Sequence, residues 1–225
     1  AYSRGSLRGR LAQASCFAVA LVAVLTPWLV RNSIILGAPA LTTQTGRFLW
    51  IGNNPHTFSH YPEESIDMSE SAAWRALTMT EIGHISNLSF DEIGQSRWFF
   101  NRGSRYMVNH LDMTLQGFAR KVGTAFSWNF SPATTDVLRQ RAYFFSYFPI
   151  LVLGVFGMVI SWRLWRHLSV IYCLFMSFII TSGLFWAHTS HRSYLDIYFM
   201  MFAAYTCRVV YSWGLNRVVR RDYAC

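Results

Sequence analysis

Apolar residues gather in four long runs along this chain, and each run is long enough to form a membrane-crossing helix. Three of the runs contain no charged residue, and the fourth carries Asp196 and Arg208 near its two ends. At about 1.5 Å of rise per residue, a helix of about 20 residues spans roughly 30 Å, the thickness of a hydrocarbon core. The pattern predicts four transmembrane helices, at residues 11–30, 143–162, 168–187 and 194–213.

The segment between the first two runs, residues 31–142, mixes polar and apolar positions. It has 112 residues, which is too long for a structureless connection, so we expect it to carry its own fold or to pack on the membrane part. Its first section, residues 34–60, is rich in Gly, Pro and Thr. This composition predicts extended chain and turns that lie over the membrane surface.

The rest of this segment shows helical patterns. The first predicted helix starts at Ser69 or Ser71 and ends near Gly83. A second begins at Ser89, because a glutamate follows this serine three residues later, as in a capping box. Residues 113–130 combine large apolar side chains with two basic ones, which predicts an amphipathic helix in the membrane interface. The segment should therefore be rich in α-helix.

Composition and charge set the orientation of the predicted helices. Hydrophobic residues make up 52% of the chain and charged residues 14%. Residues 31–142 hold ten basic and nine acidic residues, whereas the rest of the chain holds ten basic and two acidic ones. Short arginine-rich loops stay cytoplasmic, while a long loop crosses regardless of its charge. If the helices alternate, one side of the membrane receives Arg4, Arg8, Arg10, Arg163, Arg166, Arg208, Arg217, Arg220 and Arg221.

The expected fold class is a polytopic α-helical membrane protein with about four transmembrane helices and one large extracytoplasmic α-rich loop. Both termini would be cytoplasmic, and the compact loop favours a bacterial inner (plasma) membrane. Between the helices we expect a cytoplasmic basic flank at 1–10, the extracytoplasmic loop at 31–142, a cytoplasmic turn at 163–167, an extracytoplasmic turn at 188–193 and a cytoplasmic basic tail at 214–225.

The net charge of +9 does not indicate nucleic acid, because the arginines follow the positive-inside pattern instead of forming one patch. We expect no nucleic-acid partner and some contacts with membrane lipids. The four cysteines, Cys16, Cys173, Cys207 and Cys225, lie outside the long loop and lack the spacing of metal ligands. We interpret them as small packing residues.

The most specific pattern lies where the first apolar run meets the long segment. It comprises Thr26-Pro27-Trp28-Leu29-Val30-Arg31-Asn32, followed by Leu49-Trp50-Ile51-Gly52-Asn53-Asn54-Pro55. An Arg-Asn pair and a Gly-Asn-Asn-Pro turn at this depth suit an anionic, polar ligand at the bilayer surface. The pattern resembles the membrane glycosyltransferases of the GT-C type that use polyprenyl-phosphate-linked sugars, including protein mannosyltransferases and lipid A aminoarabinose transferases. The resemblance runs through most of the chain and corresponds to the C-terminal part of such an enzyme.

This resemblance implies transfer of a sugar from polyprenyl phosphate to a lipid, glycan or protein acceptor on the extracytoplasmic face. In the family, the catalytic Asp lies in the first extracytoplasmic loop, which we expect upstream of this chain. No catalytic residue is therefore assigned, and we expect the fragment alone to be inactive. The resemblance names no sugar or acceptor, and the cofactor stays open: a divalent metal is possible, but the sequence does not indicate one.

Arg31 and Asn32 are the first candidates for binding the donor, because they are expected just beyond the first transmembrane helix. Arginine can bind phosphate through two parallel hydrogen bonds and keeps its charge. The alternative is an interfacial anchor paired to lipid phosphate. Arg47 is a further phosphate candidate of the same kind. Asn53 and Asn54 either build a turn, for which asparagine is well suited, or contact the sugar or phosphate directly.

Arg192 is the remaining phosphate candidate. The positive-inside pattern disfavours an arginine in an outer turn, and Arg192-Ser193-Tyr194 matches the arginine–aromatic pair that opens a helix in the family. The prolines that follow this pair in the family are absent here. The alternative is an ion pair with Asp196, four residues along a helix. His188 and His191 share this turn, but they lack a third metal ligand, so no metal site is expected.

An acidic cluster after Tyr61-Pro62 has two interpretations. It is either a solvated turn with acids at a helix N-terminus or a carboxylate site that activates an acceptor or binds metal; it comprises Glu63, Glu64, Asp67 and Glu70. Two other functions stay open for the whole chain. The first is a non-catalytic membrane subunit whose outer loop binds a partner or a glycan. The second is a transporter, which the scarcity of ionisable groups in the apolar runs disfavours.

Overall fold

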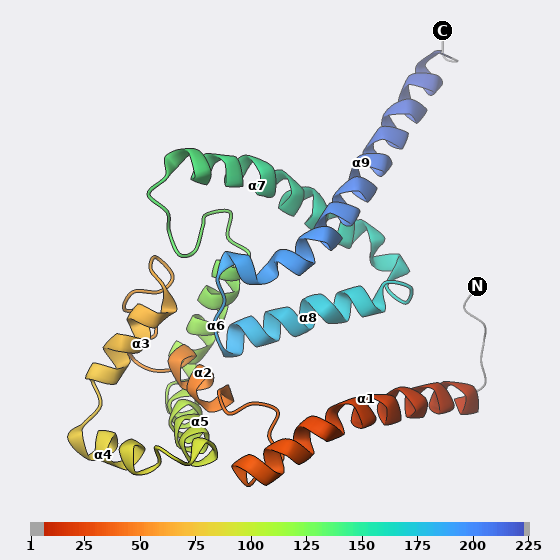
Figure 1. Cartoon of the computed structure of the whole chain (residues 1–225). Coiled ribbons are helices and arrows are strands. Elements are labelled where there is room, and N and C mark those ends of the chain that lie inside the picture. The colour runs from red at the N-terminus through yellow and green to blue at the C-terminus, as the bar shows by residue number, and fades with distance from the viewer. Residues whose placement is uncertain (1–6, 223–225) are drawn as a thin grey trace. The chain divides into compact units, whose positions relative to one another are not determined.

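Most of the described chain is helical. A computed structural model describes residues 7–222, of which 77% are helix and none is strand. This confirms the α-helical fold class. The helices are α1 (Leu7–Leu36), α2 (Thr45–Gly52), α3 (Ile66–Arg75), α4 (Met79–Asn87), α5 (Glu92–Asn109), α6 (Leu111–Ala125), α7 (Val137–Ile160), α8 (Ser169–Leu184) and α9 (Ser193–Asp222), with short 3₁₀ helices η1 (Ser161–Leu164) and η2 (Thr189–Arg192) (Figure 1).

Two of the described helical segments are long and apolar enough to cross a membrane. They are Leu11–Leu36, of 26 residues, and Val137–Leu164, of 28 residues. The third predicted span corresponds to α8, which is apolar but shorter, with 16 residues. The fourth lies in α9, a 30-residue helix that carries Asp196 in its first turn. Membrane association therefore has support from two helices, while four spans stay a prediction.

Helix α1 extends further than the apolar run predicted. Arg31 and Asn32 lie within its last two turns, and the helix ends only at Leu36. The polar Asn32 fits there because its side-chain amide donates to the carbonyl oxygen of Ala40, 2.6 Å away. Gly37 adopts a left-handed φ of 74° directly after the helix, which is the usual glycine conformation at a helix C-terminus. The chain then folds back along the last turns of α1.

The long segment contains more helices than expected. Helix α2 (Thr45–Gly52) lies inside the section that was predicted to be extended. The helix expected to end near Gly83 is instead two helices, α3 and α4, and Gly83 lies inside α4. The break has a local cause: Thr78 accepts from the backbone N–H of Glu81, and the Glu81 carboxylate accepts from that of Thr78. This capping box starts a new helix.

Several predicted helix ends also shift. Helix α5 begins at Glu92, and the Asp91 carboxylate accepts from the backbone N–H of Gly94 at 2.7 Å, so Asp91 takes the capping role expected of Ser89. The predicted amphipathic helix at 113–130 is α6, which ends at Ala125. The predicted span at 143–162 starts earlier, because Asp136 caps α7 through the N–H of Arg139. Helix α9 continues through most of the expected tail at 214–225, of which 223–225 lie outside the described residues.

The chain divides into two units. One comprises the described residues up to Arg47 together with Thr78–Asn101, and the other comprises Phe48–Leu77 and the chain from Arg102 onward. In the first, Gly46 opens the contact between α2 and the start of α5, because a Cβ there would collide with the backbone oxygen of Ser96. The first unit holds α1 and α4 as well.

The second unit contains the larger core. Helix α7 packs along α9, and the two cross in the upper part of Figure 1. Close approach is allowed by Gly154 and Gly157, which face Phe199 and Phe202 of α9. The buried core consists of Ala125, Phe175, Phe178, Ala187, Leu195, Phe199 and Phe202. This core fixes α6, α8 and the start of α9 as one frame for the polar residues described below.

Candidate functional site

The Gly52–Pro55 turn closes the C-terminal end of α2 through its own side chains. The side-chain amide of Asn53 donates to the carbonyl oxygen of Leu49 at 2.8 Å, and that of Asn54 donates to those of Trp50 and Ile51 at 2.8 and 3.1 Å. A helix leaves its last carbonyl groups without intrahelical partners, and these two asparagines supply the missing donors. The turn role considered for Asn53 and Asn54 is therefore visible in the geometry.

The same turn is anchored to the C-terminal end of α8. The Asn53 side chain also donates to the carbonyl oxygen of Leu184 at 2.6 Å. Gly52 lies so close to this end that a Cβ would collide with the backbone oxygen of Phe185. Only glycine allows this approach without moving the backbone. The turn thus has a fixed place at the end of an apolar helix.

Lys121 of α6 holds the turn from the other side. Its ammonium group donates to the carbonyl oxygen of Gly52 at 2.9 Å and to the side-chain oxygen of Asn53 at 3.2 Å. The side chain is 1% exposed, and this burial lowers the pKa of Lys121 to about 8. Sequence reasoning missed this residue. The available signal was compositional, because Lys121 is the only lysine of the chain beside nineteen arginines.

A pocket of about 200 Å³ opens beside the turn. Its lining residues are Gly52, Asn53, Asn54, Pro55, Thr57, Phe58, Tyr106, Met113, Thr114, Gln116, Gly117 and Arg120. The Arg120 guanidinium lies over the Phe58 ring, with its central carbon 4.5 Å from the ring centroid. One carboxylate oxygen of Glu63 lies 3.7 Å from it, and both side chains are exposed. The pocket therefore combines aromatic, amide and cationic groups.

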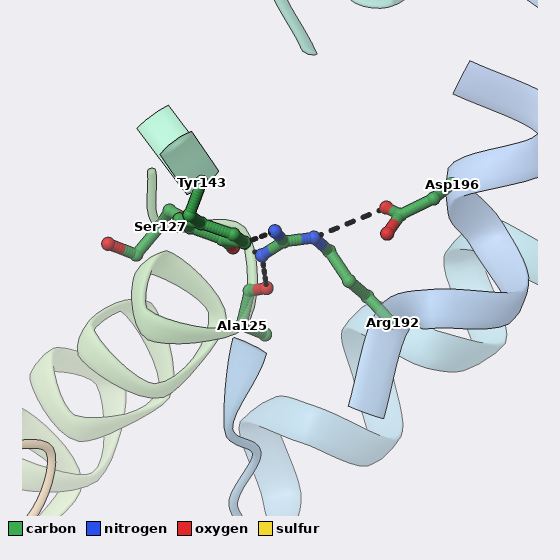
Figure 2. Close-up of polar contacts among 5 residues, drawn as sticks. All are labelled: Ala125, Ser127, Tyr143, Arg192 and Asp196. Carbon is green, nitrogen blue, oxygen red and sulfur yellow. Dashed lines mark hydrogen bonds and ion pairs between the residues drawn. The ribbon is translucent and has the colours of Figure 1, made fainter. Parts of the chain in front are cut away.

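Arg192, the last residue of η2, lies in a different cluster at the C-terminal end of α6, and Figure 2 shows its contacts. One terminal guanidinium nitrogen donates to the carbonyl oxygens of Ala125 and Ser127 at 2.6 and 3.2 Å, and the other donates to the Tyr143 hydroxyl. The Nε–H donates to the Asp196 carboxylate at 3.3 Å.

The Arg192 cluster is also buried. Arg192 is 1% exposed, and its guanidinium lies 3.6 Å from the centroid of the Tyr147 ring. Every guanidinium nitrogen is thus engaged by the chain itself. This geometry supports the ion-pair alternative for Arg192 and leaves no free edge for phosphate.

The remaining phosphate candidates, Arg31, Asn32 and Arg47, lie in the first unit. Arg31 is exposed, donates to the Asn32 side-chain oxygen at 2.9 Å and lies over the Trp28 ring at 5.1 Å. Asn32 is 2% exposed, so it orients Arg31 and shapes the chain after α1. Arg47 lies in α2. Arg31 is thus an exposed cation whose guanidinium is held in place by Trp28 and Asn32.

The histidines of the outer turn belong to a packed network. Nδ1 of His188 lies 2.9 Å from the Ser131 hydroxyl, and His188 is buried. Desolvation lowers the pKa of both His188 and His191, whose ring centroids are 5.9 Å apart. Within residues 7–222, no group of three His, Cys, Asp or Glu side chains is arranged to hold a metal ion. The network connects the loop before α7 to the turn before α9.

The acidic cluster is distributed over several structural roles. Asp67 lies in the first turn of α3, which Ser65 caps. Glu70 is buried and accepts from the Trp74 indole N–H at 3.1 Å. Glu64 pairs with His60 at 3.0 Å. The carboxylates do not converge on one point, in agreement with a turn that carries helix N-terminal acids.

Comparison of the chain with protein-family models, with curated proteins and with solved structures finds no match.

Proposed function

We propose that this chain belongs to a membrane glycosyltransferase that moves a sugar from a polyprenyl-phosphate donor to a lipid, glycan or protein acceptor on the extracytoplasmic face. The observation that carries the proposal is the placement of the Gly52–Pro55 turn. Its residues Gly52, Asn53 and Asn54 are buried, and the turn is docked on the C-terminal end of the apolar helix α8, held by Lys121 and open to a polar pocket. A turn that only connected two helices would need none of these features.

The predicted topology would place this turn on the outer side of the membrane. With four alternating spans and both termini in the cytoplasm, the C-terminal end of α8 faces the outside of a bacterial inner membrane. The turn would then lie at headgroup level, where the phosphate of a polyprenyl donor is held by its lipid tail. Irregular polar backbone at this depth is tolerated where it lines a cavity or is buried in protein.

The reaction assigns a role to each group. The oxygen of the acceptor hydroxyl attacks the anomeric carbon of the sugar, the bond from that carbon to the phosphate oxygen breaks, and polyprenyl phosphate leaves. The hydroxyl proton passes to a carboxylate base, a role to which no residue of this chain is assigned. A cation must stabilise the departing phosphate, and Arg31 is suited to this because it is exposed and oriented by Trp28 and Asn32.

The test compares two arginines at opposite ends of α1 in the complete protein that contains this chain. Arg31→Ala should lower the rate of sugar transfer from a polyprenyl-phosphate donor about tenfold or more, which is the scale of one lost charge-assisted hydrogen bond. Arg8→Ala, at the predicted cytoplasmic end of the same helix, should leave transfer unchanged. Equal activity of the Arg31→Ala and native proteins would remove Arg31 from the donor site.

A further inference from the structure

The pocket beside the Gly52–Pro55 turn has the size of a site for one small polar molecule. Its volume is about 200 Å³, whereas sites for drug-sized ligands span roughly 300–1,000 Å³. The space equals that of about six or seven water molecules, at roughly 30 Å³ each. A single sugar ring fits this volume, and an extended oligosaccharide does not. The floor is rigid, because Lys121 and the end of α8 hold the turn in place.

Arg120 supplies the charge of the pocket. Its guanidinium stacks on Phe58, so one face is covered while the nitrogen edge is left for a ligand. Its nearest acid is Glu63 at 3.7 Å, and an exposed pair at this distance contributes little free energy and exchanges readily. An arginine edge of this kind binds phosphate or carboxylate through two parallel hydrogen bonds. The pocket thus favours an anionic group at the end nearest Arg120.

Other lining residues of the pocket carry groups that suit sugar hydroxyls. Gln116 is exposed and offers an amide with both donor and acceptor atoms. The Tyr106 hydroxyl makes only a weak contact, 3.6 Å, with the sulfur of Met113. Gly117 lets the Phe58 ring lie close to α6, since a Cβ at this position would lie 3.2 Å from that ring.

We propose that this pocket binds one sugar ring that carries a phosphate group, with Arg120 holding the phosphate and Gln116 and Tyr106 contacting the sugar hydroxyls. The proposal rests on the proposed transferase function for the source of the ligand. A phosphorylated sugar reaches the pocket either as part of the lipid-linked donor, with the phosphate on the anomeric carbon, or as part of the acceptor, with the phosphate elsewhere on the ring.

The experiment measures ligand binding by the purified full chain in lipid nanodiscs, with calorimetry or ligand-observed NMR. The probes are glucose 1-phosphate, glucose 6-phosphate, glucose and inorganic phosphate. One of the two sugar phosphates should bind at least tenfold more tightly than glucose or phosphate alone. Preference for glucose 1-phosphate assigns the pocket to the donor, and preference for glucose 6-phosphate assigns it to the acceptor. Equal binding of inorganic phosphate, or binding of none of the four, would overturn the proposal.

Variants locate the binding in this pocket. Arg120→Met should weaken binding of the sugar phosphate about tenfold or more while leaving the weak binding of glucose unchanged. Arg139→Met is the matched control, because Arg139 also lies over a phenylalanine, Phe130 at 5.3 Å, but does not line the pocket. Gln116→Ala should weaken binding of both the sugar phosphate and glucose. Sugar phosphate binding that is unaffected by Arg120→Met would contradict the proposal.

Binding and transfer separate this inference from the proposed function. If the complete protein that contains this chain binds the sugar phosphate through Arg120 but transfers no sugar, the transferase function is contradicted and the pocket assignment is left intact. A protein that transfers sugar at the native rate with Arg120→Met would contradict the pocket assignment and leave the transferase function intact.

Discussion

Arg192 shows how a residue that is conspicuous in the sequence can have a structural role. It drew attention as an arginine in an outer turn, and its partner Asp196 is visible from the spacing. Its other partners, Ala125, Ser127 and Tyr143, lie 49 to 67 positions away. Such contacts depend on how α6, α7 and α9 meet, which local sequence patterns do not encode. The functional interpretation therefore changes only once the fold is known.

Replacing Arg192 should lower the free energy of unfolding of the chain and should not selectively remove a ligand site. Arg192→Met leaves two buried carbonyl groups and the Asp196 carboxylate without their donor, so we expect a loss of about 3 kcal/mol or more in the free energy of unfolding. Arg192→Lys should restore only part of it, because one ammonium cannot reach all these acceptors. Denaturant unfolding in detergent micelles measures this loss.

The control for this experiment is the exposed Arg139. Arg139→Met should change the free energy of unfolding by less than about 1 kcal/mol. If Arg192→Lys kept the native stability but abolished binding of a polyprenyl-phosphate donor, the structural role would be wrong and the phosphate role would be restored.

Lys121 should make stability depend on pH. The folded lysine has a pKa of about 8, below the ordinary value of 10.5, so the unfolded chain binds more protons between these two values. Stability should therefore rise as pH increases above 8, with a slope of up to about 1.4 kcal/mol per pH unit. The measurement is unfolding of the native chain and of Lys121→Met between pH 7 and 9.5.

Comparing the native chain with Lys121→Met isolates the contribution of Lys121 to this pH dependence. Only the native chain should gain this component of stability above pH 8, because methionine has no proton to release. Parallel curves for the native chain and the variant would mean that Lys121 has an ordinary pKa and is more hydrated than the structure indicates.

At the scale of elements, helix positions followed from the apolar runs, while helix ends depended on individual side chains. The apolar run predicted a span at 11–30, but α1 continues past Asn32. The Asn32 side chain donates a hydrogen bond to the carbonyl oxygen of Ala40, so this polar group inside the helix is satisfied. A local apolar pattern does not show that bond. The start of α4 could have been predicted, since Thr78 and Glu81 have capping-box spacing. The helix α2 interrupts a section whose Gly and Pro content favoured turns.

The pairing of α7 with α9 depends on two glycines. Gly157 lies where a Cβ would collide with the backbone oxygen of Phe202, so Gly157→Ala must push the helices apart or shift their register. We expect a loss of about 1–3 kcal/mol, the range for overpacking a core. Gly123→Ala is the control, because a Cβ there meets nothing within 4 Å and alanine favours the helix.

Thermal unfolding of both glycine variants in detergent checks this prediction. Gly157→Ala should lower the unfolding temperature, and Gly123→Ala should leave it unchanged or raise it slightly. A Gly157→Ala protein as stable as the native one would show that the two helices do not depend on this close approach.

At the scale of the whole molecule, the predicted orientation can be tested by chemical labelling. With the four native cysteines replaced, a cysteine at Thr135, in the exposed loop before α7, should react in intact cells with a maleimide that cannot cross the membrane. A cysteine at Trp165, between α7 and α8, should react only after the cells are lysed. These outcomes follow from the arginines that flank the predicted spans.

The reverse labelling pattern would invert the topology. It would also place the Gly52–Pro55 turn on the cytoplasmic side, away from donors that are used outside the cell. Labelling of both positions in intact cells would contradict a span at α7, one of the two helices that are long and apolar enough to cross a membrane.

The most direct test of the transferase function is transfer itself. The complete protein that contains this chain is reconstituted in lipid vesicles with a polyprenyl-phosphate donor whose sugar is radiolabelled, together with a membrane extract as the source of acceptor. The function predicts that label moves from the donor lipid to an acceptor while an equal amount of polyprenyl phosphate is released. Folded protein that leaves the labelled donor intact under these conditions would contradict it.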